Sequence, residues 1–328
     1  VGLLAVLLAA FVQKEWKDQT RSPFDWQGFA AIVLFMPLAI YALARGNSPS
    51  NPGGWSAPEV IGCFIVAGAA LAWFIAAELR NPAPLLQIRL LAERNFGISM
   101  AVLTLFAIGM LGGTYLLPLY MQRGLGYTAL AAGSMFLPVG VIQGVLSAVS
   151  GYLTRYVRPL LLSAAGILVM ALSFWLASRF TLHTTHGHIL FILYLRGFGM
   201  GLTFAPLNLF SLKNLTQQDM AAAAGISNSI KQLAGSIGIA LLTVILSART
   251  SYHAAHETIS AAQTYVEGVT DALRVVAVIT LAALLPLLWV FRKKRPGKSG
   301  VKGAATPSPG ETVSGKTEKT TIYRTKPE

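Results

Sequence analysis

Residues 98–119 read ISMAVLTLFAIGMLGGTYLLPL, a stretch without a charged side chain. An α-helix needs about 20 predominantly apolar residues to cross the hydrocarbon core of a bilayer, where it satisfies all of its backbone polar groups internally. The core of a soluble domain does not need an uncharged apolar run of this length. The stretch therefore predicts a membrane-spanning helix.

Seven further apolar runs lie on either side of this stretch. The first is the shortest, but its flanking residues Trp26 and Arg45 suit the two membrane interfaces, so it also fits a span. Val1 to Phe11 is apolar and too short to span, and we interpret it as the truncated end of a preceding helix. The seven spans are predicted at Gly28–Ala44, Val60–Ala77, Leu130–Ser150, Leu160–Ala177, Ile189–Asn208, Ala222–Leu246 and Ala272–Phe291.

The composition agrees with an all-α integral membrane protein. Hydrophobic residues make up 54% of the 328 positions and charged residues 12%, and the mean hydropathy is +0.59. These values lie well outside the averages of soluble domains. The single cysteine, Cys63, excludes a disulfide framework or a thiolate metal cage within one chain.

Cationic side chains are unevenly divided between the connections, and short cytoplasmic loops carry the excess of Lys and Arg. The richer side, which the basic segment 292–328 joins, is therefore predicted to be cytoplasmic. This tail is rich in Gly, Ser, Thr, Pro and Lys and is predicted to be disordered; it favours a lipid anchor over nucleic-acid binding because no folded module is visible. The richer side holds Lys14, Lys17, Arg21, Arg80, Arg89, Arg94, Arg155, Arg158 and Lys213, and the other side Arg45, Arg123, Arg179, Arg249 and Arg274.

The longest connection on the other side is predicted from Ser247 to Asp271. His253, His256 and Glu257 have the i, i+3 and i+4 spacing of a metal-binding helix face, but a solvated loop is favoured because only one short cluster is visible.

Acidic residues all fall in predicted loops, at helix ends or in the tail, so the spans offer no obvious proton carrier. The spans also hold no cluster of nucleophile, base and orienting group, which disfavours an intramembrane enzyme.

Two cations do fall inside spans: Arg196, near the middle of its helix, and Lys231. A cation in a membrane span is by default functional and faces a bundle interior or a water-filled cavity. Two purely structural alternatives stay open: Lys231 snorkels to the membrane interface, and Arg196 donates hydrogen bonds to backbone carbonyl groups. No carboxylate in these spans can pair with either, so their partner is substrate or lies outside this sequence.

A polar stripe surrounds Lys231. Asn228, Lys231, Gln232 and Gly235 stand at i, i+3, i+4 and i+7 and share one helix face. Such a stripe must face protein or water, either as a pathway lining or as an interhelical hydrogen-bond seam. Gln143, Thr104, Tyr115 and Thr203 are the other polar groups deep enough to touch a translocated molecule.

Glycines and prolines mark helices that pack closely or bend. Gly197 and Gly201 form a G-x-x-x-G pair with Gly199 between them, a pattern that lets helix backbones approach and slide. Pro206 removes a backbone donor from the same span. Gly235 and Gly238 are predicted to serve the next helix in the same way, and simple close packing is the alternative.

Five segments in order resemble the fourteen-span drug:proton antiporters of the major facilitator superfamily, the EmrB/QacA type. These segments are FDWQG (24–28), NPAPLLQIRLLAERNF (81–96), LPLYMQRGLGYTALAAG (117–133), RGFGMG (196–201) and GISNSIKQLAGSIG (225–238).

This resemblance implies a division of the chain: the end of a helix at 1–11, two central helices with loops at 12–97, the C-terminal six-helix bundle at 98–291, and the tail. It also implies that Arg196 lies on the pathway, as the counterpart of an R-x-x-x-G motif of the N-terminal half, which would be missing here. GYLTRYVRP (151–159) resembles the inner-loop G-x-L-x-D-R motif through Gly151, Arg155 and Arg158. Arg155 stands where the family has an acid, so a gate-locking ion pair is in doubt there.

The implied function is efflux of drugs or toxic amphipathic compounds by proton-coupled antiport through alternating access, in the bacterial inner membrane, with a cytoplasmic C-terminus. The energy source is the proton gradient, and no cofactor or metal is expected. The implied partners are the lipid bilayer, the missing half of the chain and, in Gram-negative members, a periplasmic adaptor with an outer-membrane duct. The alternative is export of an anionic metabolite, siderophore or lipid by the same fold.

Overall fold

The computed structural model describes residues 25–46, 51, 53–80, 88–217, 219–256 and 260–293. All regular secondary structure in these ranges is helical. The helix end predicted at 1–11 lies outside the described residues, as does the predicted tail beyond Lys293.

Eight helical segments of the described chain are long and apolar enough to cross a membrane, as predicted. Two spans are interrupted just ahead of a proline, whose ring and missing N–H disfavour continuous helix. The breaks fall at Met135–Phe136 before Pro138 and at Ala283 before Pro286. The helices are α2 (Trp26–Gly46), α3 (Pro58–Arg80), α4 (Arg94–Leu119), α5 (Ala129–Ser134), α6 (Leu137–Leu153), α7 (Pro159–Ala177), α8 (His186–Leu212), α9 (Met220–His256), α10 (Ala261–Ala282) and α11 (Leu284–Lys293), with short turns η1 (Gly54–Ser56), η2 (Ile88–Ala92) and η3 (Tyr120–Gly124).

The solvated loop predicted at 247–271 is wrong. Helix α9 continues to His256, and α10 begins at Ala261, where the Ser260 hydroxyl accepts a hydrogen bond from Gln263 N at 3.3 Å as an N-cap. Both helices persist because their facing side chains pair: His253 lies 3.0 Å from Asp271. A polar composition indicated a loop, but here it marks a polar contact between two helices.

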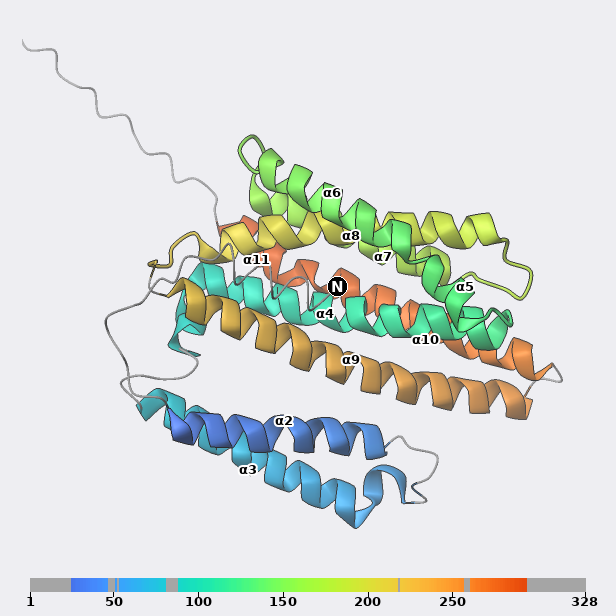
Figure 1. Cartoon of the computed structure of the whole chain (residues 1–328), viewed down its shortest axis with the longest axis horizontal. Helices are drawn as coiled ribbons and strands as arrows, with labels where there is room; N and C mark the ends of the chain where they lie inside the picture. The colour runs from blue at the N-terminus through green and yellow to red at the C-terminus, as the bar shows by residue number, and fades with distance from the viewer. Residues whose placement is uncertain are drawn as a thin grey trace, which may run out of the picture.

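Helices α4 to α11 form one bundle, and α2 and α3 form a hairpin beside it (Figure 1). Helix α4 packs against α8, α9 and α10, while α8 packs against α6 and α7. The hairpin touches the bundle through α2 and α9. Helices α8 and α9, which carry Arg196, Lys231 and the polar stripe, are thus each held mainly by neighbours other than one another.

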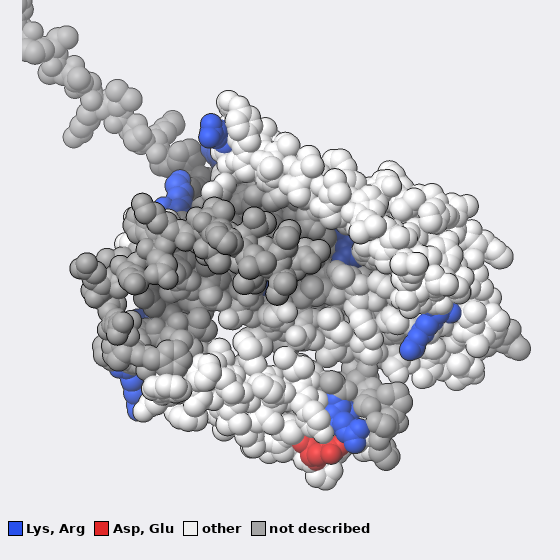
Figure 2. Space-filling model, in the orientation of Figure 1, with Lys and Arg blue, Asp and Glu red and all other residues white. Residues whose placement is uncertain are grey.

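The connections alternate between the two ends of the molecule (Figure 1). The α3–α4, α6–α7 and α8–α9 connections share one end, which holds Arg89, Arg155 and Lys213, whereas the α2–α3, α7–α8 and α9–α10 connections share the other. On the face that Figure 2 shows, the described surface between these ends carries few charged side chains. This arrangement suits a protein whose middle is surrounded by lipid.

Candidate functional site

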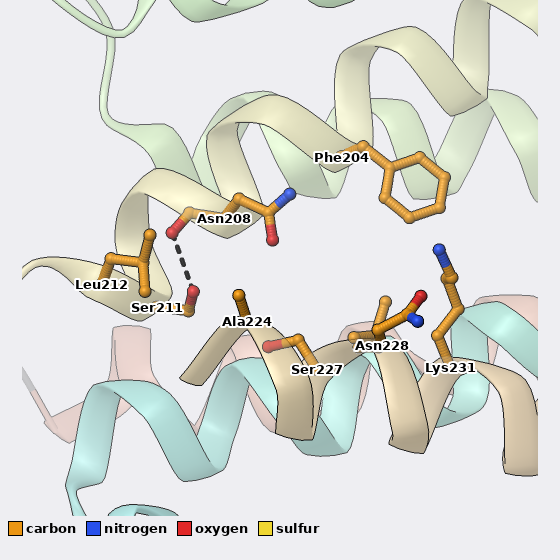
Figure 3. A pocket seen from close by; sticks show the side chains of 9 residues that line it. Phe204, Asn208, Ser211, Leu212, Ala224, Ser227, Asn228 and Lys231 are labelled. Carbon is orange, nitrogen blue, oxygen red and sulfur yellow. Dashed lines mark hydrogen bonds between the residues drawn. The ribbon is translucent and has the colours of Figure 1, made fainter. Parts of the chain in front are cut away.

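A cleft of ≈ 360 Å³ opens between α8 and α9, with α4 contributing to its wall. Figure 3 shows side chains of α8 and α9 pointing toward each other across the gap. The lining residues are Leu103 of α4; Phe204, Asn208, Ser211 and Leu212 of α8; and Ala224, Ser227, Asn228 and Lys231 of α9.

Glycines on α8 hold this helix against α6 and α7. A Cβ on Gly201 would lie 2.6 Å from Leu146 Cβ of α6, and one on Gly197 would lie 3.1 Å from the Val139 carbonyl oxygen. On the α7 side, a Cβ on Gly199 would lie 2.8 Å from Met170 N. The three predicted glycines therefore fix α8 from the sides that do not face α9.

Helix α9 is fixed in the same way, but against α4. A Cβ on Gly238 would lie 2.8 Å from both Cα and O of Ile108, and one on Gly235 would meet the Leu111 side chain at 1.9 Å. Because small residues draw α8 and α9 toward different partners, a space remains between their facing sides. The cleft is a consequence of where the glycines lie.

Polar side chains from two of the helices long enough to cross a membrane line the cleft. The Ser211 hydroxyl donates to the Asn208 carbonyl oxygen, and the Ser227 hydroxyl donates to the Ala223 carbonyl oxygen, each at 2.7 Å. The side-chain amides of Asn208 and Asn228 are exposed and make no hydrogen bond with any residue that the structure describes. Both amides are therefore available to a molecule in the cleft.

Lys231 is the only charged side chain among the described residues that line the cleft. It is half-buried, and its amine points toward the Phe204 ring (Figure 3). Within the described ranges no hydrogen bond or ion pair engages the ammonium group. The predicted polar stripe is divided: Asn228 and Lys231 line the cleft, Gly235 packs on α4, and the exposed Gln232 does not line the cleft.

Arg196 lies away from the cleft. Its guanidinium is buried, donates through Nη2 to the Met110 carbonyl oxygen at 2.8 Å and to the Thr114 hydroxyl, and lies 5.5 Å from the centre of the Phe174 ring. Its Nε and Nη1 find no partner among the described residues. The carbonyl-bonded alternative is thus the observed geometry, and contact with substrate stays a prediction.

The remaining predicted pathway residues lie outside the cleft lining. Thr203 is fully buried at the contact with α7 and donates to the Gly199 carbonyl oxygen, and Thr104 donates to the Met100 carbonyl oxygen. Tyr115 is exposed and Gln143 is half-buried. Pro206 is buried within α8.

The predicted inner-loop motif lies at the α6–α7 connection. Gly151 faces Ala205 of α8, where a Cβ would lie 4.0 Å from the Ala205 Cβ. The Arg155 guanidinium lies 5.4 Å from the centre of the Tyr152 ring, and Arg158 precedes α7. Both cations are exposed, and no ion pair between either and a described residue is observed.

Sequence reasoning missed the α8 side of the cleft. Phe204, Asn208 and Ser211 stand at i, i+4 and i+7, so they share a face, as do the α9 residues. That periodicity was visible in the sequence, but nothing indicated that this face of α8 meets the polar face of α9.

Two acids that the sequence placed in loops or at helix ends, Asp25 and Glu78, are buried. Asp25 accepts a hydrogen bond from Gly28 N at 3.0 Å and caps α2. A Cβ on Gly28 would lie 2.5 Å from Asp25 Oδ2 and 3.1 Å from Glu78 Oε1 of α3. The Asp25-x-x-Gly28 spacing within FDWQG thus serves to seat both carboxylates in the hairpin.

A charged network joins the other ends of α9 and α10. Asp271 accepts from Arg249 Nε at 2.7 Å and from Arg274 Nη1 at 2.8 Å, while His253 lies between Asp271 and Glu267. No three His, Cys, Asp or Glu residues in the described ranges are placed to hold a metal ion. Glu257 of the proposed metal face lies outside the described residues.

Comparison with known proteins finds that residues 3–239 match the family model of the Major Facilitator Superfamily. The chain is 30% identical to the multidrug export protein EmrB of Escherichia coli over 260 residues, which cover 79% of this chain and 50% of EmrB.

It is 28% identical to the fatty acid resistance protein FarB of Neisseria gonorrhoeae over 71% of this chain and 45% of FarB. It is 29% identical to the puromycin resistance protein pur8 of Streptomyces alboniger over 94% of this chain and 62% of pur8. The chain spans about half the length of the first curated relatives it matches.

Proposed function

The chain belongs to the Major Facilitator Superfamily, and from that premise we propose that it exports toxic amphipathic compounds by proton-coupled antiport. The family is one of transporters rather than enzymes, and the helices are those of a multi-pass membrane protein. Relatives named for multidrug export and for resistance to puromycin or fatty acids support efflux as the direction of transport.

The cleft between α8 and α9 is the observation that carries this proposal. It combines apolar side chains (Leu103, Phe204, Leu212) with polar ones (Asn208, Asn228) inside membrane-spanning helices. Polar groups facing lipid would be costly, so the cleft is better suited to water and a translocated molecule. Its volume of ≈ 360 Å³ lies in the range of small-molecule sites.

Alternating access gives the cleft its place in the transport cycle. Transporters of this superfamily place the substrate site near the bilayer midplane, between halves related by a repeat. The first relatives are about twice as long as the region they share with this chain. We place the cleft opposite the helices that such relatives have outside the matched region, and we assign it to one wall of the pathway.

Coupling and orientation complete the proposal. The proton gradient supplies the energy, and we assign the coupling acids to positions outside the described lining, whose residues include no carboxylate. The cation-rich end faces the cytoplasm by the positive-inside rule, in a bacterial inner membrane. An adaptor and outer-membrane duct are proposed as partners from the resemblance alone.

Export is tested with the intact protein in a bacterial strain that lacks its major exporters. We expect lower accumulation of fluorescent amphipathic dyes and raised resistance, both abolished by a protonophore. Unchanged accumulation with the protein present in the membrane would refute the proposal.

A matched pair of variants tests the cleft. Asn228→Ala removes a lining amide, whereas Gln232→Ala removes an exposed amide one turn further along α9 that does not line the cleft. We expect the first to lower export several-fold and the second to leave it unchanged. Equal export in both variants would remove the cleft from the pathway.

A further inference from the structure

Charge is unevenly distributed around the cleft, and this asymmetry bears on which compounds it accepts. Helices α4, α8 and α9, from which the described lining is drawn, contain no Asp or Glu between their first and last residues. They do contain Arg196 and Lys231. A molecule in the cleft therefore meets the charge of Lys231 with no carboxylate among the described lining residues.

The ammonium of Lys231 supplies this charge directly. It is half-buried and has no hydrogen bond or ion pair with the described residues. A partly desolvated cation attracts an anion more strongly than it would in water and repels another cation to the same extent. Lys231 therefore discriminates between ligands by the sign of their charge.

Arg196 reinforces the same sign from α8. It precedes Phe204 by about two turns of helix, roughly 12 Å at 1.5 Å per residue. Its guanidinium is buried, with hydrogen bonds to a carbonyl and a hydroxyl group rather than to an acid. Its charge is thus not neutralised by the described residues around it.

The remaining lining residues set the shape of the ligand. Asn208 and Asn228 point into the gap and have amide donors to offer, with Asn228 beside Lys231 (Figure 3). Phe204, Leu103 and Leu212 provide apolar contacts. One charged group with an amide beside it suits a single acidic head, and the apolar side chains suit an uncharged body.

We propose, on the basis of the proposed function, that the cleft selects amphipathic compounds with one carboxylate and that Lys231 binds this carboxylate. Fatty acids and acidic drugs share this chemistry. Amphipathic cations of the same length are disfavoured, because the described residues of the lining include a cation and no carboxylate with which to bind them.

A pair of probes with equal chains separates charge from hydrophobicity: decanoate and decyltrimethylammonium. Binding of each to the purified intact protein is measured by calorimetry, and tolerance to each is measured in cells. The variants are Lys231→Arg, which keeps the charge, and Lys231→Gln, which removes it. Gln232→Lys, which adds a cation one residue outside the lining, is the control.

We expect wild type to bind decanoate at least 10-fold more tightly than decyltrimethylammonium. Lys231→Gln should weaken decanoate binding about 10-fold and leave the binding of decyltrimethylammonium unchanged. Lys231→Arg should retain most of the wild-type affinity for decanoate. Gln232→Lys should behave as wild type.

Two outcomes would overturn the inference while leaving export intact. In the first, wild type exports both probes and Lys231→Gln alters the export of neither. In the second, Lys231→Gln lowers the melting temperature, which would make Lys231 part of a structural ion pair. Failure of export has a different signature, since wild type would then protect cells from neither probe. Decanoate binding that depends on Lys231 would still support the inference in that case.

Discussion

The two ends of α9 carry cations in opposite situations. In the first half of the helix, Lys231 faces the cleft with no acid among the described lining residues. Near the last residues, Arg249 binds Asp271 of α10 at 2.7 Å, and His253 lies 3.0 Å from the same carboxylate. One helix thus has a cation without a described partner toward one end and a paired network at the other.

The difference separates two uses of charge in a membrane protein. At the paired end, Arg249 and His253 of α9 both contact Asp271 of α10, so these contacts hold α9 to α10. At the cleft end, the cation has no described partner and stays available to a ligand. Removing charge from the paired network should therefore weaken the fold. Removing the charge of Lys231 should change only ligand binding.

The largest expected effect comes from a substitution between these ends that disturbs the packing of α9 against α4. Gly238→Ala would place a Cβ 2.8 Å from the Ile108 backbone, which cannot yield without moving α4. We expect a loss of about 1–3 kcal/mol in stability, measured by thermal unfolding in detergent. Gly140→Ala, with nothing within 4 Å of the new Cβ, is the control and should be unchanged or slightly stabilised. A wild-type melting temperature for Gly238→Ala would contradict the packing.

Asp271→Asn should have the next largest effect, because it leaves Arg249, His253 and Arg274 without their shared anion. We expect about 1–2 kcal/mol of lost stability, between the values for exposed and buried pairs, since the arginines are about half exposed. The double variant with Arg249→Gln should lose less than the sum of the two single losses. Strict additivity would mean that the pair makes no contribution.

Glu267→Gln should have a smaller effect. Its carboxylate is one-third exposed and lies 3.4 Å from His253 Nδ1. We expect a loss of at most about 0.5 kcal/mol, detected as a small shift of the same thermal transition. A loss as large as that of Asp271→Asn would show that Glu267, rather than Asp271, anchors His253.

Lys231→Met should have the smallest effect on stability. No described partner is left unpaired when the ammonium is removed, and the long apolar chain is retained. We expect an unchanged or slightly raised melting temperature, alongside the loss of anion binding proposed above. Destabilisation equal to that of Asp271→Asn would erase the contrast between the two ends of α9.

The sequence by itself determined the class of the protein and the number of predicted spans, because apolar length is a property of consecutive residues. It also placed Asn228 and Lys231 on one face of one helix, since helical periodicity is local. The ordered motifs pointed to the major facilitator family, and the family match confirmed this resemblance.

Only the tertiary structure decided which helix faces that stripe and which charges find partners. Phe204 and Asn208 lie across the cleft from the polar face of α9 because glycines hold α8 against α6 and α7, and α9 against α4. Arg196 turns toward Met110 instead of the cleft, and Asp271 meets Arg249 across two helices predicted to be a loop. Contacts between helices depend on shape complementarity over distant parts of the chain, which the pattern along a single helix does not encode.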